Sequence, residues 1–186
     1  MNIGIDIDDT ITKTYETLIP IVAIKYGMNI DKLFKDKPSY KMLRGILPEY
    51  DTFIRENFTG IAKVLPLKDD VIEVLNQLRK QGHKLIFISA RNYQEYEDPY
   101  KLSYEYLKSL NIPFDKLIVN AENKAKECVL ENIDLFIDDN ALHCKAVKNK
   151  GIKVIQMDTI FTENSKNLDR AYGWQDVYKK IQEMFS

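Results

Sequence analysis

Three carboxylates stand together near the start of the chain. Asp6, Asp8 and Asp9 come directly after residues 2–5, a short β-prone apolar run that predicts a buried strand. Neighbouring like charges oppose joint ionisation, and burial increases that cost, so the cluster requires a cation or a shared proton. We expect a Mg²⁺ ion to supply the positive charge, because this ion prefers oxygen ligands.

Polar side chains also follow the later apolar runs. They are Ser89 and Arg91 after residues 84–88, Lys124 after residues 116–119, and Asp138 and Asp139 after residues 135–137. In an open parallel sheet, ligands bind outside the carboxyl ends of the strands. We therefore expect these acids, cations and the hydroxyl group to meet the first cluster on one rim of a sheet.

Apolar periodicity predicts the elements that position this rim. We expect strands over residues 2–5, 84–88, 116–119, 135–137 and 153–155. We expect helices over residues 13–26, 124–131 and 141–149, one from Val71 to a stop at Gly82, one starting at Asp98-Pro99, and a last one near Gly173. This alternation predicts an α/β fold, a Rossmann-like parallel sheet with helices on both faces. Trp174 is expected to pack in the core.

Residues 28–64 interrupt the alternation. Pro38, Gly45, Pro48 and Gly60 break short helical patterns, and no period-two strand is evident. We expect a small helical insertion after the first strand. A chain of 186 residues is long enough for one core domain carrying such an insertion.

Composition narrows the function classes. The chain is 45% apolar and 30% charged, with a net charge of −1, which is typical of a soluble globular protein. It argues against a nucleic-acid polymer or an anionic membrane as the main partner. The longest apolar run, residues 18–24, is too short to span a bilayer, and we expect a cytoplasmic protein. Cys128 and Cys144 are expected to be reduced residues that pack in the core. We do not expect His143 to act as a base for Cys144, because adjacent residues of a helix point in different directions.

The order of these residues resembles the four motifs of the haloacid dehalogenase (HAD) superfamily of phosphatases. The matching segments are residues 6–11 (DIDDTI), residues 87–89 (FIS), Lys124 and residues 136–139 (FIDD). The resemblance implies an HAD-like core of residues 1–12 and 66–186, with a helical cap domain of residues 13–65. Such a cap closes over the site and excludes water.

The resemblance also implies roles for the acids. Asp6 would be the nucleophile that forms an aspartyl phosphate, and Asp8 would protonate the leaving oxygen and later deprotonate water. Mg²⁺ would bind Asp6, the main-chain carbonyl of Asp8 and one acid of the pair at residues 138–139. Asp139 is the preferred direct ligand, and Asp138 would orient a water or pair with Lys124.

The remaining polar residues would serve the phosphoryl group or the turn. Ser89 would donate a hydrogen bond to phosphate, and Lys124 would balance its charge, although Lys126 lies close by. Arg91 has three open readings: phosphate contact, contact with the insertion, or a surface pair with Glu95. Thr10 and Asp9 are expected to support the turn.

A narrower resemblance is to the cytosolic type C 5′-nucleotidases and deoxyribonucleotidases and to related bacterial nucleotidases. It rests on residues 87–92 (FISARN), Lys124 and residues 133–140 (IDLFIDDN), and it implies a nucleoside monophosphate substrate. Aromatic residues of the insertion would then stack on the base or form the insertion's own core; they are Tyr15, Phe34, Tyr40, Phe53 and Phe58. Lys41 and Arg44 would reach phosphate or solvent.

Two alternatives stay open. The chain could be a HAD phosphatase acting on another small metabolite, such as a sugar phosphate. It could also be a non-catalytic binder, or a receiver-like domain that becomes phosphorylated. A receiver would place its phosphoacceptor where this chain has Ser89, and the insertion is foreign to it. Base preference and oligomeric state are not predicted.

Overall fold

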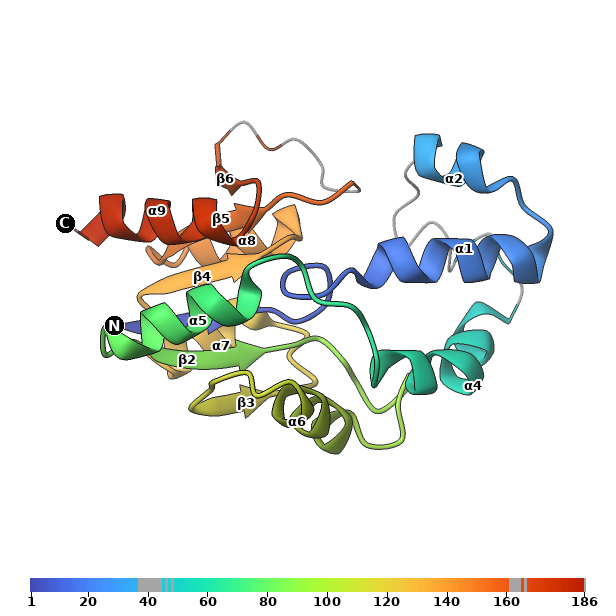
Figure 1. Cartoon of the computed structure of the whole chain (residues 1–186), viewed down its shortest axis with the longest axis horizontal. Helices are drawn as coiled ribbons and strands as arrows, with labels where there is room; N and C mark the ends of the chain where they lie inside the picture. Colours follow the sequence, from blue (N-terminus) through green and yellow to red (C-terminus); the bar gives the residue numbers. More distant parts are fainter. Residues whose placement is uncertain (37–44, 46, 48, 161–164, 166, 186) are drawn as a thin grey trace.

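The fold is built on a six-stranded parallel sheet (Figure 1). The computed structural model describes residues 1–36, 45, 47, 49–160, 165 and 167–185. The strands, in the spatial order β3-β2-β1-β4-β5-β6, are β3 (Lys116–Ile118), β2 (Lys84–Ile88), β1 (Asn2–Ile5), β4 (Leu135–Asp138), β5 (Lys153–Met157) and β6 (Asp169–Ala171). The order reverses direction after β1, so the crevice beside its carboxyl end lies in the middle of the sheet.

Helices cover both faces, which confirms the predicted fold class. One face carries α5 (Val71–Lys80), α6 (Pro99–Ser109) and α9 (Trp174–Phe185), and the other carries α7 (Lys124–Leu130) and α8 (Ala141–Lys148) (Figure 1). Because side chains alternate along a strand, Leu85 and Phe87 pack on the first face, while Ile86 and Ile88 pack on the second. The unbroken apolar runs of the sequence reflect this burial on two sides.

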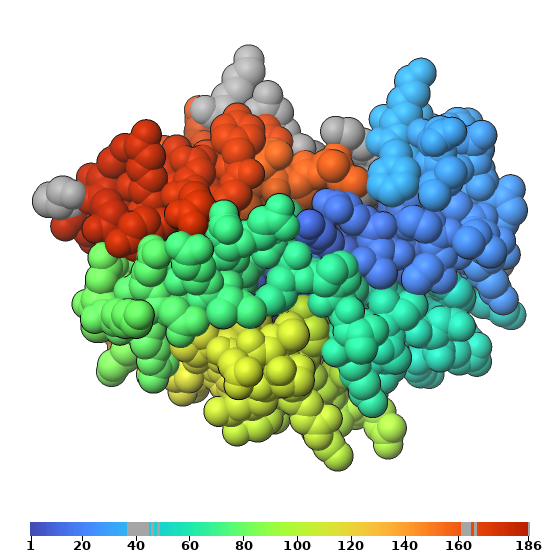
Figure 2. Space-filling view, viewed as in Figure 1, coloured from blue at the N-terminus to red at the C-terminus, as the bar shows by residue number. Residues whose placement is uncertain are grey.

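Three further helices lie beyond the carboxyl ends of the strands. They are α1 (Thr14–Tyr26), α2 (Ile30–Asp36) and α4 (Tyr50–Ala62), which form one side of the molecule in blue and teal (Figure 2). Gly27 ends α1 with a φ of +62°, a conformation that glycine adopts readily. Tyr26 and Phe53 join α1 to α4 by an edge-to-face contact with ring centroids 5.8 Å apart.

The two chain segments that connect these helices to the sheet pair with each other. Lys13 donates its backbone N–H to Pro66 at 2.8 Å, and Lys68 donates to Ile11 at 2.8 Å. These bonds flank an antiparallel bridge between Thr12 and Leu67. The insertion therefore leaves and rejoins the core at one point, close to the proposed domain boundaries.

The end of the chain differs from the prediction. Residues 169–171 form β6, an edge strand that the sequence analysis did not predict because Asp-Arg-Ala is no apolar run. The predicted last helix is present as α9. Trp174 is buried, as expected, and donates its indole N–H to the backbone oxygen of Thr10 at 3.1 Å. Within the residues described, no helix is long and apolar enough to cross a membrane.

Candidate active site

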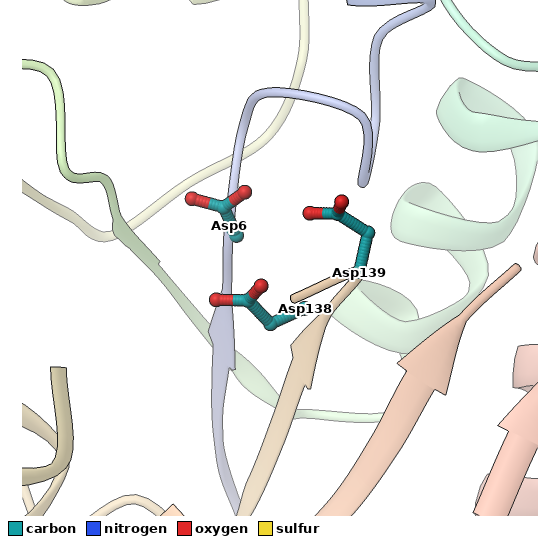
Figure 3. A group of neighbouring side chains, drawn as sticks. All are labelled: Asp6, Asp138 and Asp139. Atoms are coloured by element: carbon teal, nitrogen blue, oxygen red, sulfur yellow. The ribbon is translucent and has the colours of Figure 1, made fainter. Parts of the chain in front are cut away.

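Neighbouring strands bring the predicted acids together. Because β1 lies beside β4, Asp6 follows β1 at the level where Asp138 ends β4, and its backbone N–H bonds to Ile137 at 3.0 Å. One carboxylate oxygen from each of Asp6, Asp138 and Asp139 lies within 4.8 Å of the other two (Figure 3). The three side chains point toward a shared space at the carboxyl edge of the sheet.

The turn after β1 holds this arrangement. Asp9 has a φ of +56°, and its carboxylate accepts the backbone N–H of Tyr15 at 3.0 Å, which satisfies a free donor in the first turn of α1. Thr10 donates its hydroxyl to Asp6 at 3.3 Å and accepts the backbone N–H of Asp139 at 3.1 Å. Both residues support the turn, as the sequence analysis expected.

Lys124, rather than Lys126, points into the site. Asn123 caps α7 by accepting the backbone N–H of Lys126 at 3.1 Å, which sets the start of the helix. The Lys124 ammonium is then 2.5 Å from Asp6 Oδ1 and 2.7 Å from Asp138 Oδ2, with the residue only 3% exposed. Lys126 is exposed. Burial lowers the pKa of Lys124, but the charges of Asp138 and Asp6 outweigh it and raise that pKa.

Arg91 forms an ion pair that the sequence analysis missed. Its Nε and Nη2 donate to the two oxygens of Asp8 at 2.8 and 2.9 Å, and Nη1 donates to Ser103 in α6 at 3.3 Å. Arg91 is buried, which rules out the third open reading, a pair with Glu95 on the surface. Burial raises the pKa of Asp8, but the charge and hydrogen bonds of Arg91 lower it below its ordinary value.

The negative charges of Asp6, Asp9 and Asp139 are poorly balanced by the cations of the site. Burial raises the pKa of Asp6 to about 6, although the charge of Lys124 opposes the rise. Burial also raises the pKa of Asp9 to about 7. Burial, together with the charge of Asp138, raises the pKa of Asp139 well above its usual range. The site thus disfavours the ionised form of three carboxyl groups, which a bound cation would reverse.

The donor set fits a hard divalent cation. Carboxylate oxygens are the ligands that Mg²⁺ prefers, and three of them converge here. Asp138 is committed to Lys124, to the backbone N–H of Asn140 at 2.7 Å and to His143 at 3.2 Å. In the described part of the chain no donor bonds to the Asp139 carboxylate, so it is the acid most available to a metal. The preference for Asp139 as direct ligand stays a prediction.

A cavity of about 450 Å³ opens above these acids. The site aspartates and Lys124 line it on the sheet side. Its other lining residues include Tyr15 and Leu18 of α1, Ile54 and Phe58 of α4, and Ala90, Arg91, Asn92, Glu95 and Tyr96. The cavity therefore lies between the sheet edge and the inserted helices. His143, which the sequence analysis dismissed, also lines it; no sequence signal indicated that this residue faces Asp138.

The other residues predicted for the site lie in different parts of the structure. Among the candidate aromatics, Phe53 and Phe58 belong to the hydrophobic core, and Tyr15 and Phe34 pack against it. Tyr15 and Phe58 also line the cavity. Tyr40, Lys41 and Arg44 lie outside the described residues. Ser89 follows β2, is 1% exposed, and accepts the backbone N–H of Arg91 at 3.2 Å. Its neighbours Ala90 and Arg91 line the cavity.

Known proteins resemble this chain over its whole length. A family model described as "5′ nucleotidase, deoxy (Pyrimidine), cytosolic type C protein" matches residues 1–185. A nucleotidase of Clostridium acetobutylicum is 31% identical over 191 residues, covering 100% of this chain and 95% of that protein.

Solved structures share the fold at low sequence identity. A predicted phosphatase from Clostridium acetobutylicum superposes with a TM-score of 0.71, with 15% identity over 98% of each chain. CbbY from Rhodobacter sphaeroides, in complex with xylulose-(1,5)bisphosphate, has a TM-score of 0.62 and 11% identity, over 93% of this chain and 94% of that one.

Proposed function

Because the chain belongs to the cytosolic type C 5′-nucleotidase family of HAD-like phosphatases, we propose that it is a Mg²⁺-dependent nucleotidase that acts through an aspartyl phosphate. The family match favours an enzyme over the receiver-like and non-catalytic alternatives. The observation that carries the proposal is the Lys124 ammonium between Asp6 and Asp138 at the floor of the cavity.

The proposed reaction has two steps on one phosphoryl group. Asp6 attacks phosphorus, and the bond from phosphorus to the ester oxygen breaks while Asp8 gives that oxygen a proton. Asp8 has to take up this proton before the step, because Arg91 favours its ionised form in the free protein. Asp8 then takes a proton from water, whose oxygen attacks the phosphorus of the aspartyl phosphate and releases Asp6 and inorganic phosphate. One carboxyl group serves both steps because their proton demands are opposite.

Cationic groups and donors stabilise the transferred charge. Mg²⁺ would be held by Asp6, the main-chain carbonyl of Asp8 and Asp139. When bound, it would neutralise the charge of the phosphoryl oxygens that the Asp6 carboxylate approaches. Lys124 adds a fixed positive charge beside Asp6, and Ser89 is proposed to donate a hydrogen bond to phosphate. Asp138 would orient Lys124, since it accepts from the same ammonium at 2.7 Å.

A nucleoside monophosphate is the proposed substrate. The family description names a 5′-nucleotidase, and the relative in Clostridium acetobutylicum is a nucleotidase. The cavity supports the proposal, because Tyr15 and Phe58 line it together with the polar residues of the site.

A sugar phosphate is the second candidate. It is favoured by the shared fold of CbbY, whose structure holds a sugar bisphosphate. At 11% identity this likeness shows a shared fold and does not indicate the substrate. The nucleotide therefore stays the first choice.

A substrate screen tests the proposal. Purified protein is given nucleoside 5′-monophosphates, the matching 3′-monophosphates and sugar monophosphates, each with Mg²⁺ and each with EDTA, and released phosphate is measured. We expect Mg²⁺-dependent release that is fastest from a 5′-nucleotide. Fast hydrolysis of sugar phosphates with slow hydrolysis of nucleotides would reject the substrate but keep the phosphatase, and equal rates in EDTA would reject the metal dependence.

A further inference from the structure

Trp174 reaches the active-site turn from the far end of the chain. It is the single tryptophan of the sequence and the first residue of α9, and its side chain is buried. Its indole N–H donates to the main-chain oxygen of Thr10 at 3.1 Å. Among the described residues, no other donor bonds to that oxygen, so the indole alone fixes the direction of this carbonyl group.

The side chain of Thr10 joins two of the acids proposed to hold Mg²⁺. Its hydroxyl donates to Asp6 Oδ2 at 3.3 Å and accepts the backbone N–H of Asp139 at 3.1 Å. The two bonds connect the turn after β1 to the turn after β4. Thr10 is fully buried, so solvent does not compete for these bonds. The position of one hydroxyl group therefore affects both acids.

Asp139 is positioned through its backbone. In the part of the chain that the structure describes, no donor bonds to its carboxylate, whereas both polar groups of its main chain are held. Its N–H bonds to Thr10, and its main-chain oxygen accepts the side-chain amide of Gln156 in β5 at 3.0 Å. A ligand whose carboxylate is otherwise unrestrained depends on such contacts for its place.

Helix α9 gives this chain of contacts a fixed base. Val177 and Ile181 of the same helix are buried, and α9 lies beside α5 on one face of the sheet (Figure 1). The rigid indole ring carries its one donor in a single direction, so the packed helix sets where the Thr10 carbonyl lies. A side chain that only filled this space would need the ring and not the N–H.

We propose that Trp174 is a positioning residue for the metal site: by holding the main chain of Thr10, it keeps the threonine hydroxyl between Asp6 and Asp139. The inference rests on the proposed function, since it takes these two acids as ligands of Mg²⁺. Trp174 is not among the described residues that line the cavity, so it would act without touching the nucleotide.

Calorimetry of Mg²⁺ binding to the protein alone tests the inference. Trp174→Phe keeps a buried aromatic ring and removes the N–H. Tyr106→Phe is the matched control, because it removes another buried aromatic donor, whose hydroxyl bonds to the main-chain oxygen of Leu65 at 2.8 Å. Asp139→Asn identifies the part of the heat that belongs to the proposed site.

We expect Trp174→Phe to raise the Kd for Mg²⁺ by about 3- to 10-fold. Groups that bond directly to a metal ligand typically change affinity by about 10- to 100-fold, and Trp174 acts one residue further away. With saturating Mg²⁺, the KM for a nucleoside 5′-monophosphate should change by less than about 2-fold. Tyr106→Phe should bind Mg²⁺ as the native protein does, although both variants should melt at a lower temperature.

A double variant shows whether the effect passes through Thr10. Thr10→Val removes the hydroxyl at nearly the same size and keeps the carbonyl, so it breaks the connection to both acids. In this background we expect Trp174→Phe to raise the Kd for Mg²⁺ by less than about 2-fold, because coupled residues give non-additive effects.

Four results would overturn the inference. A native Kd in Trp174→Phe with a lower melting temperature would make Trp174 a structural residue only. An equal rise of Kd in Tyr106→Phe would assign the effect to general destabilisation, and the full additional loss in the double variant would assign it to another route. Binding heat that Asp139→Asn leaves unchanged would reject the metal site of the proposed function itself, and the inference with it.

Discussion

At the scale of single residues, the site holds more negative charge than its own cations balance. Five aspartates line the cavity with two buried cations, Lys124 and Arg91; the aspartates are Asp6, Asp8, Asp9, Asp138 and Asp139. Burial raises the pKa of Asp138 and of Asp8, but Lys124 with His143 outweighs it at Asp138, and Arg91 outweighs it at Asp8, so both pKa values are lowered. The excess charge falls on the other three acids, whose pKa values are raised.

This imbalance predicts how stability depends on pH without metal. Because the pKa of Asp6 is raised to about 6 and that of Asp9 to about 7, the folded protein binds more protons than the unfolded chain above their ordinary pKa. The free energy of unfolding then falls as pH rises from about 4 to about 7, by at most about 1.4 kcal/mol per pH unit and group. Burial lowers the pKa of His83, which makes the free energy of unfolding rise with pH. This is one group, and the raised pKa values of the aspartates outweigh it.

Urea unfolding in EDTA at a series of pH values measures this slope. Saturating Mg²⁺ should reduce it, because the ion binds the ionised carboxylates of Asp6 and Asp139 and stabilises the folded state most at high pH, whereas Asp9 is not a proposed ligand. Asp139→Asn is the informative variant, since it removes one of the charges and should flatten the slope in EDTA. A free energy of unfolding that rises with pH in EDTA, or the same slope with and without Mg²⁺, would contradict this explanation.

At the scale of elements, close packing of β1 against β4 sets where the acids stand. Gly4 lies in β1 next to Phe136 of β4, and a Cβ atom at residue 4 would lie 2.9 Å from the Phe136 ring and 3.3 Å from Ile133. The absent side chain lets the Phe136 ring fill this space. The Lys124 ammonium lies 5.9 Å from the centre of the same ring, so this packing also supports the site.

Gly4→Ala is therefore expected to destabilise the fold. Overpacking should lower the free energy of unfolding by about 1–3 kcal/mol, measured by urea unfolding. Gly60→Ala is the matched control, because Gly60 lies inside α4 with open space around it and should gain about 0.5–1 kcal/mol from better helix propensity. An unchanged stability of Gly4→Ala would show that the contact with Phe136 is not tight.

The elements also show what a sequence predicts and what it misses. Asp6, Lys124, Asp138 and Asp139 could be placed together because strand ends of a parallel sheet meet at one edge. β6 was missed because its three residues carry no apolar pattern, and its pairing comes from β5. Helical spacing marked the aromatic residues of the insertion, but it does not tell which of them face the cavity.

Contacts between distant loops are the hardest to predict. Arg91 and Asp8 are 83 residues apart, and neither lies in a helix or strand. No periodicity links such residues, so the sequence left the partner of Arg91 open. Ser89 is a related case, since its position after β2 was predicted but its burial was not.

At the scale of the whole molecule, the site depends on two parts of the chain. The sheet edge supplies the acids and Lys124, and the inserted helices supply Tyr15 and Phe58 to the same cavity. The segments that join these parts pair at Thr12 and Leu67, next to the turn that carries Asp6. This arrangement is the reason to expect that the core performs the chemistry and the insertion selects the substrate.

The central claim is that Asp6 carries the phosphoryl group. The most direct measurement gives the native protein and Asp6→Asn a nucleoside 5′-monophosphate with labelled phosphate in the presence of Mg²⁺, quenches with acid within one turnover, and counts label bound to protein. We expect label on the native protein, lost on treatment with hydroxylamine, and none on Asp6→Asn, whose phosphate release should fall by about 10³-fold or more. Full activity of Asp6→Asn, or label that persists on that variant, would contradict the account.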